Sequence, residues 1–226
     1  MRAILFDFGG TIDTNGVHWS EMFREYYRRH HLRVEKEAFD RAFVAIEQAL
    51  LREADIATLD FRQLLVRQFT LQMGLLGIND PGGLADRLGG ECFGEVADTV
   101  ASARDLLAVF GKRYLLGLVS NFYGNLVPVC RGFGLDGLFG TMVDSAVEGV
   151  RKPDPAIFML ALERLGVPAA EAWVVGDSYD RDIVPGKTLG CSTIWLRGGG
   201  WTTPADTAAA DVTITSLGAM RSIVLP

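Results

Sequence analysis

The chain has 226 residues, of which 49% are hydrophobic, and its formal net charge is −6. This length accommodates one large domain or a core with an inserted domain, and the hydrophobic content excludes an intrinsically disordered chain. Acidic and basic residues are mixed along the sequence, so we expect neither nucleic acid nor an anionic membrane as a partner. A small phosphorylated ligand stays compatible with this charge, because its site needs only local donors and a metal ion.

Three cysteines, Cys92, Cys130 and Cys191, are widely separated in the sequence. Their spacing matches neither a zinc site nor a disulfide framework, which predicts a reducing, cytoplasmic location. No apolar run approaches the length of a membrane-spanning helix, and the N-terminus leads directly into a strand. We therefore expect no membrane partner, and the sequence gives no indication of oligomeric state.

The first predicted element is a short buried strand, Ala3–Phe6, which ends at an acidic residue. Asp7 follows the strand directly, and a carboxylate at such a place is costly to bury unless it is used or paired. Gly9 and Gly10 allow the backbone to approach a ligand closely, and Thr11 supplies a hydroxyl donor. Ligands bind at the carboxyl edge of open α/β sheets, so this stretch predicts a functional site.

Residues 15–100 are predicted to form an all-helical insertion. Apolar residues recur there at steps of three and four, as in Trp19, Phe23, Tyr26 and Tyr27. A third helix is expected over residues 60–73, and a further helical stretch leads to residue 111. The aromatic stripes are typical of helix packing, so we expect them to form a core rather than a ligand site.

Strands and helices alternate after residue 114. Apolar strands are expected at 115–119, 140–143, 172–175, 192–196 and 212–215, with helices at 125–133, 155–165 and 178–190. Such alternation predicts a parallel, doubly wound sheet. The predicted fold is therefore α/β, with a core formed by residues 1–14 and 101–226 and the helical insertion between them.

Four polar residues occupy comparable places in this predicted core. Asp7, Ser120 and Asp177 each follow the last apolar residue of a strand, and Lys152 lies just before a helix. Because the carboxyl ends of parallel strands share one edge, we expect the four residues to converge on one crevice. Their convergence predicts a common site rather than four unrelated surface groups.

The chemistry of this set is consistent with an anionic substrate. Two neighbouring carboxylates repel each other unless a cation separates them, and a hard ion such as Mg²⁺ prefers oxygen ligands. The ion, Lys152 and donors from Thr11, Ser120 and the backbone would neutralise an anionic group. A carboxylate in line with that group could attack it and form a covalent intermediate.

In their order and positions, these motifs resemble those of the haloacid dehalogenase-like hydrolase superfamily. Residues 7–11 are similar to its first motif, 120–121 to its second, 152–153 to its third, and 176–178 with Asp182 to its fourth. The resemblance covers the whole core and places the helical insertion where the family has a helical cap. It implies a Rossmann-like catalytic core over which the cap closes.

The resemblance also implies a role for each motif residue. Asp7 would be the nucleophile, Thr11 and Ser120 would hold the phosphoryl oxygens, and Lys152 would steady the negative charge. Substrate-binding positions would be Gly10, His18, Ser120, Asn121 and Lys152.

The implied magnesium site combines Asp7, the backbone carbonyl of Gly9, Asp177 and Asp182. We expect Asp182 to act indirectly, by orienting a metal-bound water or Lys152, with Asp180 as the alternative for that role.

The sequence departs from the family pattern at Gly9. Phosphatases of the family carry an aspartate there, which protonates the leaving group and later activates water. A positioned acid–base group of this kind accelerates a reaction roughly 10²–10⁴-fold, or about 3–5 kcal/mol of barrier. Three nearby residues could replace it, namely His18, Asp13 and Glu21, and His18 has the most suitable ordinary pKa.

The absence of an aspartate at position 9 is also compatible with other functions. Dehalogenases of the superfamily also lack the second aspartate. They do not use Mg²⁺, however, and they lack the Gly-Asp pair that this chain has at Gly176 and Asp177, which argues against dehalogenation. Phosphonatases keep the metal and use a cap lysine, for which Lys36 is the only candidate in residues 15–100. A weakly active binding or regulatory module is the third alternative. We expect a Mg²⁺-dependent hydrolase that acts on a small phosphate monoester through an aspartyl-phosphate at Asp7.

Overall fold

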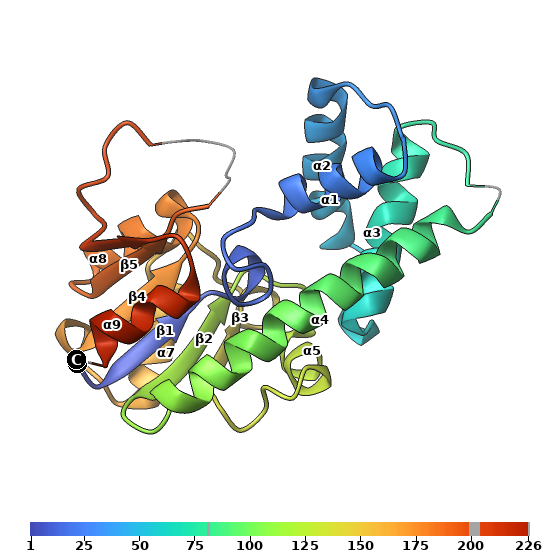
Figure 1. The fold of residues 1–226 in the computed structure, drawn as a ribbon. Helices are drawn as coiled ribbons and strands as arrows, with labels where there is room; N and C mark the ends of the chain where they lie inside the picture. Colours follow the sequence, from blue (N-terminus) through green and yellow to red (C-terminus); the bar gives the residue numbers. More distant parts are fainter. Residues whose placement is uncertain (81, 199–203, 226) are drawn as a thin grey trace.

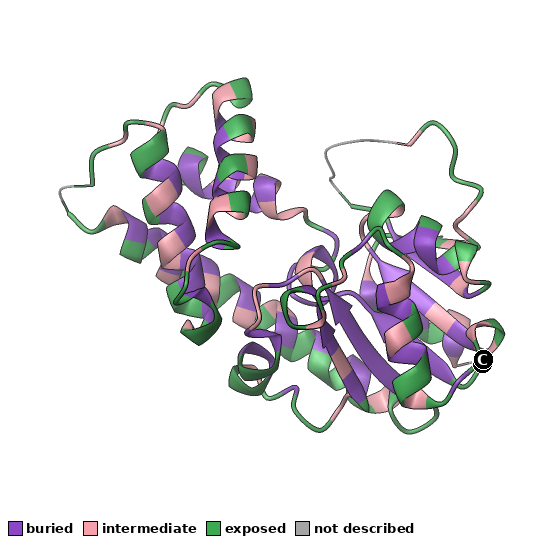
Figure 2. Ribbon diagram, turned by 180° about the vertical axis from the view of Figure 1, so that it is seen from behind, coloured by how far each residue is buried: buried purple, intermediate pink, exposed green. Residues whose placement is uncertain are grey.

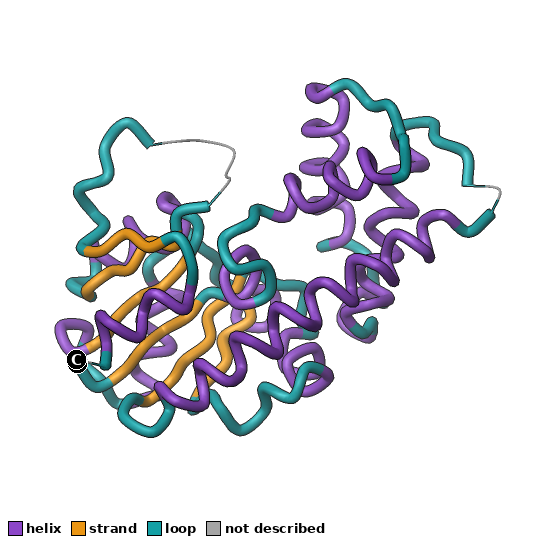
Figure 3. The backbone as a smooth tube through the Cα atoms, in the orientation of Figure 1, coloured by secondary structure: helices purple, strands orange, loops and turns teal. Residues whose placement is uncertain are grey.

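The computed structural model describes residues 1–80, 82–198 and 204–225. A parallel sheet and its covering helices form one unit, and a group of helices projects from it (Figure 1). The strands are confined to the first unit (Figure 3). Their bounds are β1 Ala3–Phe6, β2 Leu115–Ser120, β3 Thr141–Asp144, β4 Ala172–Gly176, β5 Ser192–Leu196 and β6 Val212–Ile214.

The six strands run in the order β3-β2-β1-β4-β5-β6, and every pair is parallel. The chain builds the sheet outward from β1 to β3 on one side, then returns to place β4 on the other side of β1. The order therefore reverses between β1 and β4, which is where open α/β sheets bind ligands. This arrangement confirms the predicted doubly wound α/β fold.

The strands are apolar because helices cover both faces of the sheet. Alternate residues of β1 point to opposite faces, so Ile4 and Phe6 belong to one buried cluster and Ala3 and Leu5 to another. Figure 2 shows the strands largely buried, with the edge strand β6 only partly so. The helices that cover the sheet are α5 Leu126–Gly132, α6 Ser145–Glu148, α7 Ala156–Leu165, α8 Val184–Thr188, α9 Arg221–Val224 and the second half of α4.

The inserted unit is helical, as predicted. Its helices are α1 Trp19–Arg29, α2 Lys36–Leu50, α3 Phe61–Leu75 and the first half of α4 Leu84–Phe110. The predicted aromatic stripes form its core, since the ring of Phe23 stacks on Phe69 at 4.1 Å between centroids and Tyr27 meets Phe39 edge-on at 5.4 Å. A capping box of Asp60 and Gln63 begins α3.

The helix α4 connects the two units. It runs without interruption from the projecting helices to the sheet (Figure 1), so the predicted boundary at residue 100 falls inside it. One continuous cluster of buried apolar residues follows it from Phe69 in α3 to Phe110 and Leu118 beside the sheet. The division into residues 15–100 and the remainder stays a prediction. Among the described helices, none is long and apolar enough to cross a membrane.

Candidate active site

Asp7 and Asp177 emerge next to each other at the carboxyl edge of the sheet. The strands before them pair in parallel with Phe6 opposite Val175, and the Asp7 N–H donates to the Val175 carbonyl at 2.9 Å. They follow β1 and β4, the two strands between which the sheet order reverses. The sheet therefore places both carboxylates at its switch point.

Lys152 joins two carboxylates in the buried part of the site. Its ammonium nitrogen lies 2.5 Å from Asp7 Oδ1 and 2.6 Å from Asp182 Oδ1, and all three residues are buried. Burial by itself would lower the pKa of Lys152, but the attraction of Asp182 and Asp7 outweighs it and raises that pKa. Lys152 therefore stays charged and offsets part of the negative charge.

Within the described residues, Lys152 is the only cation that pairs with these carboxylates, so part of their negative charge stays uncompensated. Burial raises the pKa of Asp7 to about 6, although the neighbouring Lys152 lowers it. Burial also raises the pKa of Asp177, and the carboxylates of Asp7 and Asp182 add to this rise. Three carboxylates thus share the space with one ammonium group, and a cation among them would relieve their repulsion.

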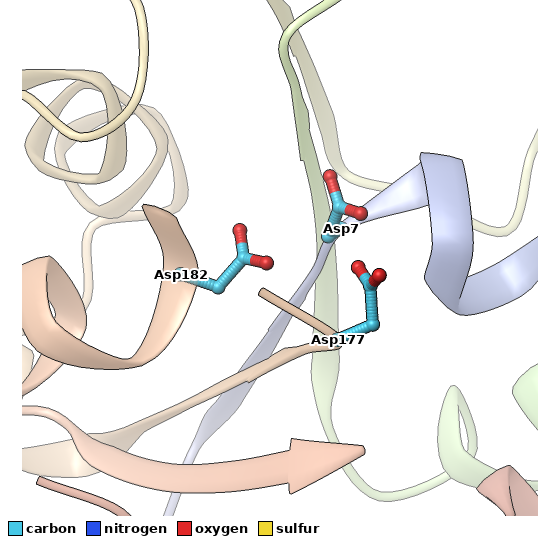
Figure 4. A group of neighbouring side chains, drawn as sticks. All are labelled: Asp7, Asp177 and Asp182. Atoms are coloured by element: carbon cyan, nitrogen blue, oxygen red, sulfur yellow. The ribbon is translucent and has the colours of Figure 1, made fainter. Parts of the chain in front are cut away.

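A metal ion fits this group of aspartates. Asp7, Asp177 and Asp182 each offer a carboxylate oxygen, and these oxygens lie within 4.8 Å of one another. Figure 4 shows the three side chains directed toward a common space. All three donors are carboxylate oxygens, which hard divalent cations such as Mg²⁺ prefer. Their type and their excess charge fit Mg²⁺, while the ligand role of the Gly9 carbonyl stays a prediction.

Thr11 and Gly10 hold Asp177 against Asp7. The Thr11 hydroxyl lies 3.3 Å from Asp7 Oδ2 and 3.3 Å from Asp177 Oδ1, and it accepts the Asp177 N–H at 3.0 Å. Gly10 has a φ of +89°, and a Cβ added to it would stand 2.3 Å from Asp177 Oδ2. Glycine is required there both for its backbone conformation and for the approach of the carboxylate.

Ser120 and Asn121 end β2 at the same edge. Ser120 is buried. The Asn121 amide nitrogen donates to the Lys152 carbonyl at 3.1 Å, and its oxygen accepts the Lys152 N–H at 2.9 Å. In the structure the Asn121 amide holds the backbone that carries Lys152, and its predicted role in substrate binding stays a prediction.

The two aspartates that follow the fourth motif lie in different environments. Both belong to the π-helical turn Tyr179–Ile183. Asp182 is 1% exposed, pairs with Lys152 and accepts the Ser178 N–H at 3.1 Å. Asp180 is exposed. The structure therefore brings Asp182, rather than Asp180, into the group around Lys152.

His18 begins the helix α1. Its Nδ1 accepts the Ser20 N–H at 3.2 Å, which caps the helix. Burial and, to a smaller extent, the positive charge of Arg181 lower the pKa of His18 to about 4. The imidazole is therefore neutral at neutral pH, where it is a poor proton donor. Its role in substrate binding stays a prediction, as do the roles of Gly10, Ser120 and Thr11 toward a substrate.

Asp13 lies beside the turn that follows Asp7. It is buried, its Oδ1 accepts the Gly10 N–H at 2.7 Å, and its Oδ2 accepts the indole N–H of Trp19 at 2.9 Å. Sequence reasoning named Asp13 only as a substitute acid and did not predict this link to Trp19. Asp13 follows an apolar residue, Ile12, in the first motif, and that pattern was the available signal of its burial.

A second buried carboxylate, Asp144, was missed altogether. It ends β3, opposite Ser120 in the register, and its Oδ2 accepts the N–H groups of Gly124 at 2.9 Å and Leu126 at 3.1 Å. It thereby fixes the loop that leaves Ser120. The signal was present, because Asp144 follows apolar strand residues in the same way as Asp7 and Asp177.

The sequence is similar to those of known hydrolases. The family model described as haloacid dehalogenase-like hydrolase matches residues 1–190. A zebrafish (Danio rerio) protein, haloacid dehalogenase-like hydrolase domain-containing protein 3, is 38% identical over 126 residues, which cover 52% of this chain and 50% of the relative. Glyceraldehyde 3-phosphate phosphatase of Pyrococcus abyssi is 42% identical over 65 residues, covering 29% of this chain and 27% of the relative. The chain thus matches half or less of the length of these relatives.

Solved structures resemble the chain over nearly its whole length. The Bacillus subtilis hydrolase YfnB, solved with bound magnesium, has a TM-score of 0.60 at 21% identity and covers 99% of this chain and 98% of its own. A dehalogenase solved with an intermediate complex has a TM-score of 0.66 at 21% identity, covering 99% of this chain and 96% of its own. At this level of identity the likeness establishes the fold alone.

Proposed function

Because this chain belongs to the haloacid dehalogenase-like hydrolase family, we propose that it hydrolyses a small phosphate monoester with Mg²⁺, through an aspartyl-phosphate at Asp7. The observation that carries this proposal is the setting of Asp7. Its carboxylate is buried at the switch point of the sheet, next to Lys152 and within a group of oxygens that fits a divalent cation. An anionic substrate group and a nucleophilic carboxylate can meet there without mutual repulsion.

Asp7 is suited to nucleophilic attack at neutral pH. Its pKa of about 6 leaves the carboxylate form dominant there. One carboxylate oxygen would form a bond to phosphorus while the ester bond breaks, and the leaving oxygen would take up a proton. Water would then attack the phosphorus, break the bond to Asp7, release phosphate and restore the carboxylate.

The other residues of the site would bind and orient the phosphoryl group. Lys152 would stabilise the charge that develops on its oxygens, and the hydroxyls of Thr11 and Ser120 would donate hydrogen bonds to them. Mg²⁺ held by Asp7, Asp177 and Asp182 would neutralise the phosphoryl oxygens and favour attack by an anionic nucleophile.

We propose a small phosphorylated metabolite as the substrate. The phosphatase from Pyrococcus abyssi supports this class of compound, because glyceraldehyde 3-phosphate is a small phosphate monoester. The three cysteines are free and buried, which is compatible with the reducing cytoplasm that the sequence predicts.

The alternatives receive less support from the site. A phosphonatase would need a lysine that reaches the substrate, whereas Lys36 is exposed and pairs with Asp40 at 2.5 Å on the surface of α2. Dehalogenation does not explain the three clustered carboxylates. A binding module without activity does not explain why Asp7 is paired with Lys152 and also lies in a group of carboxylates that fits a divalent cation.

The test compares an aryl phosphate with an alkyl phosphate, each with Mg²⁺ and with a chelator, in the wild type and Asp7→Asn. We expect turnover that needs the metal and disappears in the variant. A 2-haloacid and a phosphonoaldehyde serve as competing substrates. Release of halide without metal, or turnover of the phosphonoaldehyde alone, would assign one of the alternative functions instead.

A further inference from the structure

The space beside Gly9 is bounded by one carboxyl group and one indole. Gly9 has φ −74° and ψ 118°, a conformation open to any residue. A Cβ added to it would lie 3.7 Å from Trp19 Nε1 and 4.0 Å from Asp13 Oδ2, which are ordinary contact distances. A side chain at position 9 would therefore project toward Asp13 and Trp19.

The Asp13 carboxyl is held in a fixed orientation. Its two oxygens accept the N–H groups of Gly10 and Trp19 described above. The Trp19 ring is itself packed edge-on against Phe23 and Phe61, with centroids at 5.9 and 5.8 Å. The carboxyl is thus preorganised, and Oδ2 lies on the side of Gly9, which is only half-buried.

We propose that Asp13 is the general acid and base that replaces the missing side chain at position 9, and that Trp19 is its positioning residue. This inference rests on the proposed function and supplies its missing proton. Asp13 Oδ2 lies 4.0 Å from the point where a side chain at position 9 would begin, and catalytic hydrogen bonds that are long in the free enzyme commonly tighten when substrate binds.

Asp13 gives up one proton in the first step of the reaction and regains one in the second. Protonated Asp13 gives its proton to the leaving oxygen while the ester bond to phosphorus breaks and the bond to Asp7 forms. The resulting Asp13 carboxylate then takes a proton from the water that attacks the phosphorus, so it ends protonated as it began. No further reactant is needed.

Burial favours the protonated form of Asp13 at neutral pH. Burial raises the pKa of Asp13 to about 8, and the N–H bonds to its oxygens oppose that rise. The charged group that adds to the rise is Asp7, and Asp177 also faces Asp13. The thiols of Cys92 on α4 and Cys130 on α5 face it too, and burial raises the pKa of both, so they stay neutral.

His18 is less suited to the same role. Its Nδ1 is engaged in capping α1, and its pKa of about 4 leaves little of the protonated form at neutral pH. Glu21 pairs with Arg24 on α1. Among the three residues that the sequence offered as substitutes, Asp13 is the one placed against Gly9.

The experiment measures kcat/KM against pH for an alkyl and an aryl phosphate with Mg²⁺. In Asp13→Asn we expect alkyl turnover to fall about 10²–10⁴-fold and aryl turnover far less, since an acidic leaving group needs little protonation. The fall in wild-type alkyl activity as pH rises through about 8 should vanish in the variant. Adding Gly9→Asp to Asp13→Asn should restore alkyl turnover, because position 9 has room for the side chain.

Trp19→Phe tests whether Trp19 positions Asp13. It also provides a second test of the inference if Asp13→Asn fails to fold. Loss of the indole N–H removes a hydrogen bond that lowers the pKa of Asp13. The fall in alkyl activity at alkaline pH, called the alkaline limb of the pH profile, should therefore move to higher pH. Equal losses on both esters in Asp13→Asn with an unmoved alkaline limb would overturn the inference. Loss of the alkaline limb in His18→Gln, rather than in Asp13→Asn, would also overturn the inference. A wild type that hydrolyses neither ester would overturn the proposed function itself, and this inference with it.

Discussion

The side chain of Asn121 forms two hydrogen bonds with the backbone of Lys152, one as donor at 3.1 Å and one as acceptor at 2.9 Å. These bonds tie the end of β2 to the segment between β3 and α7. They fix the backbone from which the Lys152 ammonium reaches Asp7 and Asp182. Asn121 therefore acts on the site through Lys152.

We predict that Asn121→Ala lowers turnover roughly 10²-fold, because a misplacement of about 1 Å in an active site has an effect of that size. A double-mutant cycle with Lys152→Ala gives the decisive comparison. If Asn121 acts through Lys152, adding Asn121→Ala to Lys152→Ala should cost little further activity. Fully additive losses in kcat/KM would contradict the assignment.

Two lysine–aspartate pairs of the same length should differ in their effect on stability. Lys152 lies 2.5 Å from Asp7 with its side chain 2% exposed, and Lys36 lies 2.5 Å from Asp40 with its side chain 63% exposed. Lys152→Met leaves buried carboxylates unpaired and should lower the free energy of unfolding by about 3–5 kcal/mol. Lys36→Met should change it by less than about 1 kcal/mol.

Urea unfolding in the presence of a chelator measures both variants without a contribution from bound metal. Similar midpoints for the two variants would show that the buried pair is not needed for stability.

The adjacent glycines of the first motif should respond differently to alanine. Gly10→Ala forces a left-handed backbone on alanine and places its Cβ against Asp177, so we expect lower stability and weak Mg²⁺ binding. Gly9→Ala meets only ordinary contacts and should fold normally. Calorimetric Mg²⁺ titration of both folded proteins is the measurement, and equal affinities would contradict the predicted role of Gly10.

Asp13 should make the protein less stable as pH rises. Its pKa is raised from 3.8 to about 8 in the folded protein, so between these values the folded state holds a proton that the unfolded state has lost. The free energy of unfolding therefore falls as pH increases across this range. Asp13→Asn should flatten this dependence, which thermal unfolding in chelator can follow. A variant with the wild-type slope would show that Asp13 is ionised in the folded protein.

Much of this site follows from local sequence patterns. Apolar runs that end in Asp7, Ser120 and Asp177 predict parallel strands, and parallel strands share an edge, so their convergence needs no knowledge of distant contacts. Lys152 follows from a different rule, because it lies shortly before α7, whose N-terminus is expected to face the same edge. Strand direction alone places only the three residues at the strand ends.

The remaining features depend on loop and turn conformation. Asp180 and Asp182 are two residues apart, and the π-helical turn decides which of them meets Lys152. The use of Asn121 on the Lys152 backbone and of Trp19 on Asp13 depends on segments that are distant in sequence or belong to different units. Hydrophobic periodicity carries no information about such polar contacts.

Trapping the phosphoryl group on the protein tests whether Asp7 is the nucleophile. Wild type and Asp7→Asn are mixed with a radiolabelled phosphate monoester and Mg²⁺, quenched in acid during the first turnover, digested and mapped. We expect label on the wild-type peptide that contains Asp7, and neither label nor turnover in Asp7→Asn. Label on a different side chain, or wild-type turnover by Asp7→Asn, would contradict this expectation.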